Sequence, residues 1–296
     1  MQRGIGQLSC LQLLSQFTVG KQRGCKIEEL QGLNLRGGLE IEGLEKVLDG
    51  IDAEKANLKE KQHLRKLSFS WNVADDLVMG MKENFDSVIE GLRPHPNLQC
   101  LHISNYMGVG FPMWLMDLKV PNLVEISLFN CSRCIILPQL SQLRFLKVLA
   151  ITYLPELEIW PSGESPSVQK LTVYGCPKLT HMPNLPSLTM LELVGCKEML
   201  LSFVASCPLL DSLCIGGFPE LTSFPEGLFQ NKSLLKSLEI WECPKLKSLP
   251  KDLCSNATIK RLELSNCNEA ESFREEIKRN FTSLKCLGFS STSIDE

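Results

Sequence analysis

The sequence predicts an α/β solenoid: a curved, horseshoe-like stack of repeats with a parallel sheet on its concave face and an irregular or short-helical convex side. Three observations predict this fold. The chain has 296 residues and 51 leucines, whereas aromatic residues make up only 7%. The leucines recur in a motif with a nearly constant period. Prolines recur between the motifs, where they exclude long helices because proline lacks an amide hydrogen and fixes φ.

The cleanest copies of the motif read L-x-x-L-x-[L/I/V]-x-x-C-x-x-[L/M]. One copy comprises Leu235, Leu238, Ile240, Cys243 and Leu246. The fourth motif position falls at residues 67, 101, 126, 149, 171, 191, 213, 238, 262 and 287. The first interval is 34 residues and the others are 20–25 residues. That period is typical of a leucine-rich repeat, so the sequence predicts a leucine-rich repeat solenoid.

Each motif predicts one short strand. Its two apolar residues alternate, so they share one face of the strand, and stacked copies bury this face in a continuous core. A cysteine follows the strand in five copies. Because cysteine is small, commonly buried and a weak S–H donor, we expect this column to be buried, reduced and structural. The column comprises Cys131, Cys176, Cys196, Cys243 and Cys267.

We expect residues 1–296 to form a single solenoid of about 10–11 repeats. Residues 64–296 carry the regular repeats and residues 1–63 carry divergent ones, in which Leu39–Ile41 is a further candidate strand. The apolar spacing i, i+3, i+4, i+7 predicts an amphipathic helix within residues 43–64. The residues with that spacing are Leu44, Val47, Leu48 and Ile51.

The long first interval predicts an expanded repeat at residues 72–97. It contains an acidic stretch around Asp75 and Asp76, which we expect to be a loop. The apolar spacing within residues 82–92 then predicts a helix on the convex side.

Composition excludes several classes of function. The formal net charge is −3, which argues against nucleic-acid or anionic-membrane binding. No apolar run approaches the length of a membrane span, and the first residues do not resemble a signal peptide. We therefore expect the 13 cysteines to be reduced and the protein to be cytoplasmic.

No catalytic motif stands out. Phosphate-binding loop, kinase, G-x-S-x-G and H-E-x-x-H patterns are absent from the sequence. Cys131-x-x-Cys134 has no second ligand pair with which to complete a tetrahedral zinc site, so two core positions are the favoured interpretation. We expect no enzyme activity, no catalytic residues, no cofactor and no metal.

The remaining strand positions face the concave side. Tyrosine and tryptophan are enriched at the anchors of protein interfaces, so this face is a candidate protein-binding site. The alternative is that the rings cover neighbouring backbone and bind nothing. The candidate residues are His102, Phe129, Thr172, Tyr174, Glu192, Glu239, Trp241 and Glu263.

Several segments, including the two Cys-Pro-Lys-Leu sequences at 176–179 and 243–246, carry a family resemblance. The others are 4–8, 11–20, 30–44, 52–58, 64–71, 92–98 and 111–114. Together they resemble the leucine-rich repeat region of plant intracellular disease-resistance proteins, the nucleotide-binding leucine-rich repeat receptors of coiled-coil type. The chain lacks their phosphate loop, and so looks like a fragment or a repeat-only relative.

The resemblance implies a recognition module that senses a pathogen effector or a modified host target and contacts a nucleotide-binding domain in its resting state. ADP or ATP would bind only that domain, which is missing from this chain. One alternative is the substrate-recognition repeats of an F-box-type ubiquitin ligase, although residues 1–20 are too short for an F-box. The ectodomain of a surface receptor kinase would need a signal peptide and paired disulfide caps.

Overall fold

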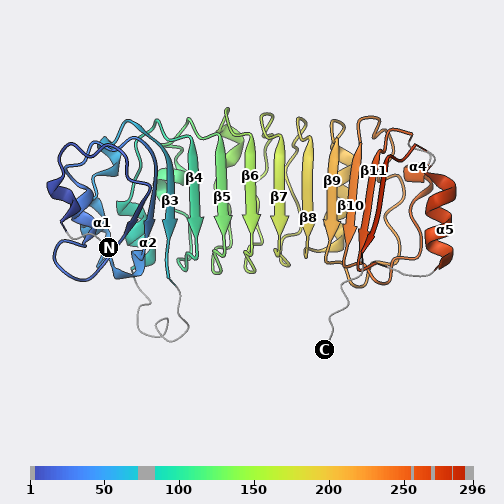
Figure 1. The fold of residues 1–296 in the computed structure, drawn as a ribbon, viewed down its shortest axis with the longest axis horizontal. Coiled ribbons are helices and arrows are strands. Elements are labelled where there is room, and N and C mark those ends of the chain that lie inside the picture. The colour runs from blue at the N-terminus through green and yellow to red at the C-terminus, as the bar shows by residue number, and fades with distance from the viewer. Residues whose placement is uncertain (1–3, 73–83, 255–256, 268–270, 282, 291–296) are drawn as a thin grey trace. The chain divides into compact units, whose positions relative to one another are not determined.

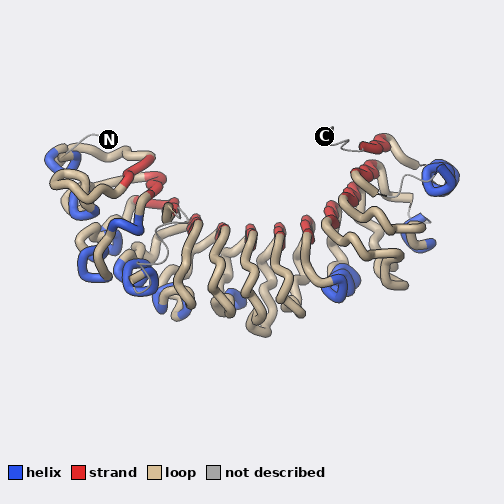
Figure 2. Tube along the Cα trace, turned by 90° about the horizontal axis from the view of Figure 1, so that it is seen from below, coloured by secondary structure: helices blue, strands red, loops and turns tan. Residues whose placement is uncertain are grey.

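A computed structural model describes residues 4–72, 84–254, 257–267, 271–281 and 283–290. The chain forms two compact units, Met1–Pro161 and Ser162–Glu296. In both units short parallel strands are joined by loops and short helices (Figure 1). The strands line one side of each unit, and most helices line the other (Figure 2).

The first unit contains six described strands, and each strand after β1 is hydrogen-bonded in parallel to the strand before it. They are β1 (Gln16–Thr18), β2 (Gly37–Glu42), β3 (Leu64–Ser70), β4 (Cys100–Ser104), β5 (Glu125–Phe129) and β6 (Val148–Thr152). The motif leucines are in register, because Leu67 pairs with Leu101 and Leu101 with Ile126. β2 contains the predicted pair Leu39–Ile41, whereas β1 was not predicted.

The second unit contains six further described strands, also parallel. They are β7 (Lys170–Tyr174), β8 (Met190–Val194), β9 (Ser212–Gly216), β10 (Ser237–Trp241), β11 (Arg261–Ser265) and β12 (Cys286–Ser290). All ten motif positions predicted from the sequence therefore lie in strands, and the leucine-rich repeat solenoid is confirmed. We call the sheet side that points away from the leucine core the open face of each unit.

The core of each unit is the stack of motif residues. From Leu67 to Leu262 the motif leucines, and the isoleucine Ile126, at the fourth position are at most 2% exposed. Leu287, on the last strand, is 36% exposed. Cys131, Cys176 and Cys243 are fully buried, as predicted, while Cys196 and Cys267 are half-buried.

Segments outside the sheet are mostly irregular, as the prolines predicted. The first unit has 3-10 turns η1 (Ile5–Gln7), η2 (Ile27–Leu30) and η6 (Leu140–Gln142) and the helix α3 (Met113–Met116). The second has η7 (Glu198–Ser206), α4 (Lys251–Cys254) and α5 (Glu271–Asn280). None of the described helices is long and apolar enough to cross a bilayer.

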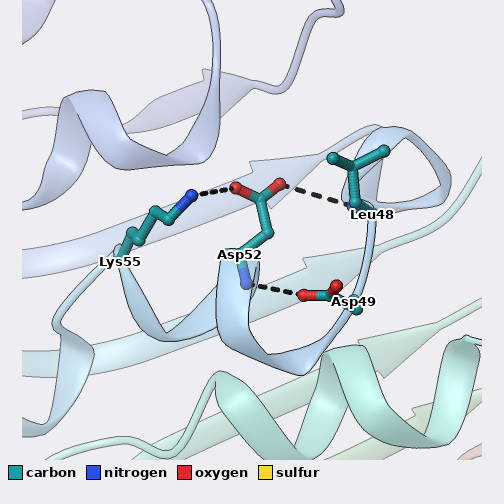
Figure 3. Close-up of polar contacts among 4 residues, drawn as sticks. All are labelled: Leu48, Asp49, Asp52 and Lys55. Atoms are coloured by element: carbon teal, nitrogen blue, oxygen red, sulfur yellow. Dashed lines mark hydrogen bonds and ion pairs between the residues drawn. The ribbon is translucent and has the colours of Figure 1, made fainter.

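The single amphipathic helix predicted within residues 43–64 is wrong. The structure has three short pieces there: η3 (Leu44–Lys46), α1 (Gly50–Glu54) and η4 (Leu58–Glu60). Asp49 starts α1 by accepting a hydrogen bond from the Asp52 amide at 2.8 Å, and Asp52 accepts one from the Leu48 amide (Figure 3). A capping residue has non-helical backbone, so the chain cannot continue one helix through Asp49. Leu48 and Ile51 are consequently 67% and 74% exposed.

The helix predicted within residues 82–92 is present as α2 (Phe85–Gly91), with Val88, Ile89 and Leu92 buried. The hydroxyl of the buried Tyr106 lies within hydrogen-bond distance of two acceptors, a carboxylate oxygen of Asp86 and the Gly110 carbonyl oxygen, the latter at 2.8 Å. These bonds connect the expanded repeat to the repeat that follows. The predicted acidic loop at Asp75 and Asp76 lies outside the described residues.

Candidate functional site

The eight residues predicted from the sequence all lie at open-face positions, but in different units. His102 and Phe129 belong to the first unit. The second unit holds the other six: Thr172, Tyr174, Glu192, Glu239, Trp241 and Glu263. The alternating side-chain directions of the strands that carry them explain this placement, because residues between buried leucines must point away from the core.

The structure brings Tyr174 and Trp241 together. Their ring centroids are 6.1 Å apart and their planes differ by 29°, although they belong to β7 and β10. Such a pair prefers offset stacking because of the ring quadrupoles. Val194 and Gly216 occupy the same register position on the two intervening strands, and both are buried. The two rings and this small-residue stretch form what we call the aromatic platform: Tyr174, Val194, Gly216 and Trp241.

Gly216 permits this arrangement. A Cβ atom at Gly216 would lie 2.4 Å from Cε2 of Trp241, so the indole lies directly against the glycine backbone. The indole Nε1 donates a hydrogen bond to Sγ of Cys214 at 3.2 Å. The indole is therefore held flat along the sheet by a glycine and a cysteine from the preceding strand.

Two carboxylates lie beside the platform. Thr172 Oγ1 donates to Glu192 Oε2 at 3.2 Å, and register places Cys214 between Glu192 and Glu239 on adjacent strands. Burial raises the pKa of the Cys214 thiol to about 11; the bond from Trp241 opposes that shift, and Glu192 and Glu239 add to it. At neutral pH the thiol is therefore protonated, which makes it a poor nucleophile.

Glu263 and the candidates of the first unit have separate partners. Glu263 forms a 3.0 Å ion pair with Arg261 on its own strand. His102 Nε2 lies 3.0 Å from Glu125 Oε1, and the ring of Phe129 meets Tyr153 edge-on at 5.8 Å. Phe129 and Tyr153 are 43% and 45% exposed. Five of the eight predicted residues therefore lie together in the second unit: Thr172, Tyr174, Glu192, Glu239 and Trp241.

The remaining cysteines show a structural arrangement. Cys267 Sγ lies 3.5 Å from the Ile240 carbonyl oxygen and 3.4 Å from that of Ser265, so it donates toward the backbone of adjacent strands. Burial raises the pKa of Cys134 to about 12 and that of Cys196 to about 11. Within the described ranges no three His, Cys, Asp or Glu side chains are grouped to hold a metal ion.

Sequence reasoning placed Cys214, Gly216 and Val194 at open-face positions but did not single them out. The available signal was that Val194 and Gly216 stand between Tyr174 and Trp241 at one register position on consecutive strands. Glu125 and Arg261 were not among the predicted residues because they lie at the first open-face position of their strands, before the apolar motif residues.

Comparisons with known proteins agree with the fold and the motifs. Residues 27–154 match the family described as R13L1/DRL21 leucine-rich repeats. The chain is 34% identical over 269 residues to disease resistance protein RGA2 of Solanum bulbocastanum, covering 84% of this chain and 27% of the relative. It is 32% identical over 314 residues to a disease resistance RPP13-like protein 1 of Arabidopsis thaliana, covering 86% and 29%. The chain thus spans less than a third of these curated relatives.

Solved structures show the same fold. A crystal structure of a TLR13-ssRNA13 complex superposes with a TM-score of 0.63 at 19% identity, covering 96% of this chain and 40% of that one. The leucine-rich repeat protein LIC12759 of Leptospira interrogans superposes with a TM-score of 0.54 at 18% identity, covering 95% and 73%. At these identities the likeness concerns the fold alone.

Proposed function

Because the chain is a leucine-rich repeat region of the kind carried by plant disease resistance proteins, we propose that it is a non-enzymatic recognition module that senses pathogen effectors or a modified host protein. We propose further that it holds an upstream nucleotide-binding switch domain in its resting state, in the cytoplasm. ADP or ATP would then bind that domain and not this chain.

The aromatic platform is the observation that carries the recognition role. Tyr174 and Trp241 present large ring surfaces that no motif position requires for the core, and both stay partly exposed. Aromatic side chains of this kind supply most of the binding energy at many protein interfaces because they bury a large area with few rotatable bonds. Partners are therefore expected to be proteins.

The resting-state role requires differential binding. A repeat region favours the resting conformation only if it binds that conformation more tightly than the active one, and an effector releases it only by competing with or altering that contact. The relatives are named as resistance proteins, which favours this role over that of an F-box-type substrate adaptor.

Co-precipitation tests the proposal. The full 296-residue chain would be used to capture the nucleotide-binding region of a resistance protein of this family, expressed as a separate polypeptide. We expect stable capture, which Tyr174→Ala and Trp241→Ala weaken if the platform takes part. Met199→Ala is the matched control, because Met199 is an exposed apolar residue of the second unit outside the sheet. Absence of any stable association would reject the resting-state role.

A further inference from the structure

The charge on the open face of the second unit is uneven. Its middle register row runs Thr172, Glu192, Cys214, Glu239 and Glu263 on successive strands. Glu263 is neutralised by Arg261, whereas the donor that Glu192 receives from Thr172 is a neutral hydroxyl. Within the described part of the chain, neither Glu192 nor Glu239 forms an ion pair with a lysine or arginine. Two negative charges therefore lie uncompensated beside Cys214.

The aromatic platform borders these charges directly. Trp241 follows Glu239 by two residues on β10, and its Nε1 bonds Cys214, the residue that register places between the two glutamates. A guanidinium group is recognised by an aromatic face together with carboxylates, because it stacks on rings and forms bidentate hydrogen bonds with carboxylates. A compact ammonium group is more strongly hydrated and fits this combination less well.

We propose that the open face of the second unit binds an arginine-bearing segment of a partner protein, with the guanidinium groups placed against Trp241 and between Glu192 and Glu239. The proposal deepens the proposed function, because it names the chemistry of the protein that the module recognises. The occupant is a basic, extended peptide segment; it is neither a nucleic acid nor an acidic surface.

The strand spacing sets the pattern of that segment. Glu192 and Glu239 lie two strands apart, which corresponds to roughly 9–10 Å between their backbones. Alternate residues of an extended peptide point to the same side and are roughly 7 Å apart. Since glutamate side chains are flexible, arginines at alternate positions of the segment can each meet one carboxylate.

A labelled peptide tests the proposal. The probe is fluorescein-Gly-Arg-Gly-Arg-Gly-Arg-Gly, titrated with the full chain in a fluorescence anisotropy assay at low and moderate salt. We expect saturable, salt-weakened binding and weaker binding of the lysine version. The Glu192→Gln/Glu239→Gln double variant should bind about tenfold more weakly, which is what loss of two partly exposed ion pairs allows. Trp241→Phe should also weaken binding, because it removes the bond to Cys214 that fixes the ring.

Glu40→Gln is the matched control, since Glu40 is an exposed open-face glutamate of the first unit. Circular dichroism and thermal melting of each variant separate a lost site from a lost fold. The proposal is overturned if the wild-type chain does not bind the arginine peptide, if a glutamate peptide binds equally well, or if Glu40→Gln weakens binding as much as the double variant. The co-precipitation uses a different partner, so the two experiments can fail separately. If only the peptide fails to bind, the arginine proposal is rejected and the proposed function stands. If only the co-precipitation fails, the resting-state role is rejected and the peptide result stands.

Discussion

Trp241 and Cys214 are joined by a side-chain hydrogen bond across two neighbouring repeats, from the indole Nε1 to the cysteine Sγ at 3.2 Å. Sulfur is a weak acceptor, so the bond orients the ring more than it stabilises the fold. The ring also stacks on Tyr174 of β7, which adds a second contact to the same indole. Together these contacts determine how the indole is presented on the open face.

Gly216→Ala should disrupt this presentation. The new methyl group would lie 2.4 Å from Cε2 of Trp241, and the indole must move because the neighbouring backbone cannot. We expect a loss of about 1–3 kcal/mol in the free energy of unfolding and a changed tryptophan emission spectrum. Gly32→Ala is the control, because no atom lies within 4 Å of its added Cβ. An unchanged spectrum in Gly216→Ala would contradict the placement of the ring.

Lys61 should be a major stabilising residue of the first unit. It is 4% exposed, and its Nζ donates to the carbonyl oxygens of Leu30 and Leu33 at 2.7 Å each. Lys61→Met keeps the aliphatic stem but leaves buried carbonyl groups without a donor, so we expect a loss of about 3 kcal/mol in urea denaturation. Lys59→Met, at an exposed position nearby, should change stability by less than about 0.5 kcal/mol.

The same residue predicts a pH effect. Burial lowers the pKa of Lys61 from 10.5 to about 8. Between these values the unfolded chain binds more protons than the folded chain, so the contribution of Lys61 to stability increases as pH rises through that window. The neutral amine still has hydrogens to donate to its carbonyl partners. We expect the stability gap between wild type and Lys61→Met, from urea curves, to be wider at pH 9.5 than at pH 7. An equal gap at both pH values would show that the folded-state pKa is not lowered.

Those parts of the fold that depend on local pattern could be predicted from the sequence. Alternating leucines require strands, and their constant period requires stacked strands in register, so Leu171, Leu191 and Leu213 align without further information. β1 was missed because Gln16–Thr18 buries only Phe17 and carries no pair of motif leucines. The prediction of one helix within residues 43–64 was wrong because apolar periodicity carries no information about the N-cap at Asp49.

The geometry of the site could not be predicted from the sequence, because it depends on contacts between repeats. The position of the Trp241 ring follows from Gly216 and Cys214, which lie 25 and 27 residues earlier in the chain. Sequence pattern placed these residues on the open face, yet only the strand register shows that a glycine lies beneath an indole. Likewise, Glu263 is neutralised by Arg261, and the motif does not specify the direction of the Arg261 side chain.

The cap of α1 gives a further prediction. Asp49→Ala removes the acceptor for the Asp52 amide, and N-cap substitutions of this kind cost about 1 kcal/mol of stability. Asp49→Asn retains a side-chain oxygen in the same place and should remain close to wild type. Urea denaturation of the two variants makes the comparison, and equal losses in both would indicate that charge, not capping, is what Asp49 contributes.

Thiol reactivity distinguishes the exposed cysteines from the buried ones. Cys10 and Cys286 are exposed, whereas Cys131, Cys134, Cys176, Cys207 and Cys243 are buried. Burial raises the pKa of Cys134 to about 12 and that of Cys207 to about 11, so few thiolates exist at these sites near pH 8. We expect an aromatic disulfide reagent to label Cys10 and Cys286 first in the native chain and all 13 cysteines in urea. If peptide mapping found Cys131 or Cys134 among the first labelled thiols, the pair would be accessible and activated. That result would support a redox or metal-binding role for these two cysteines.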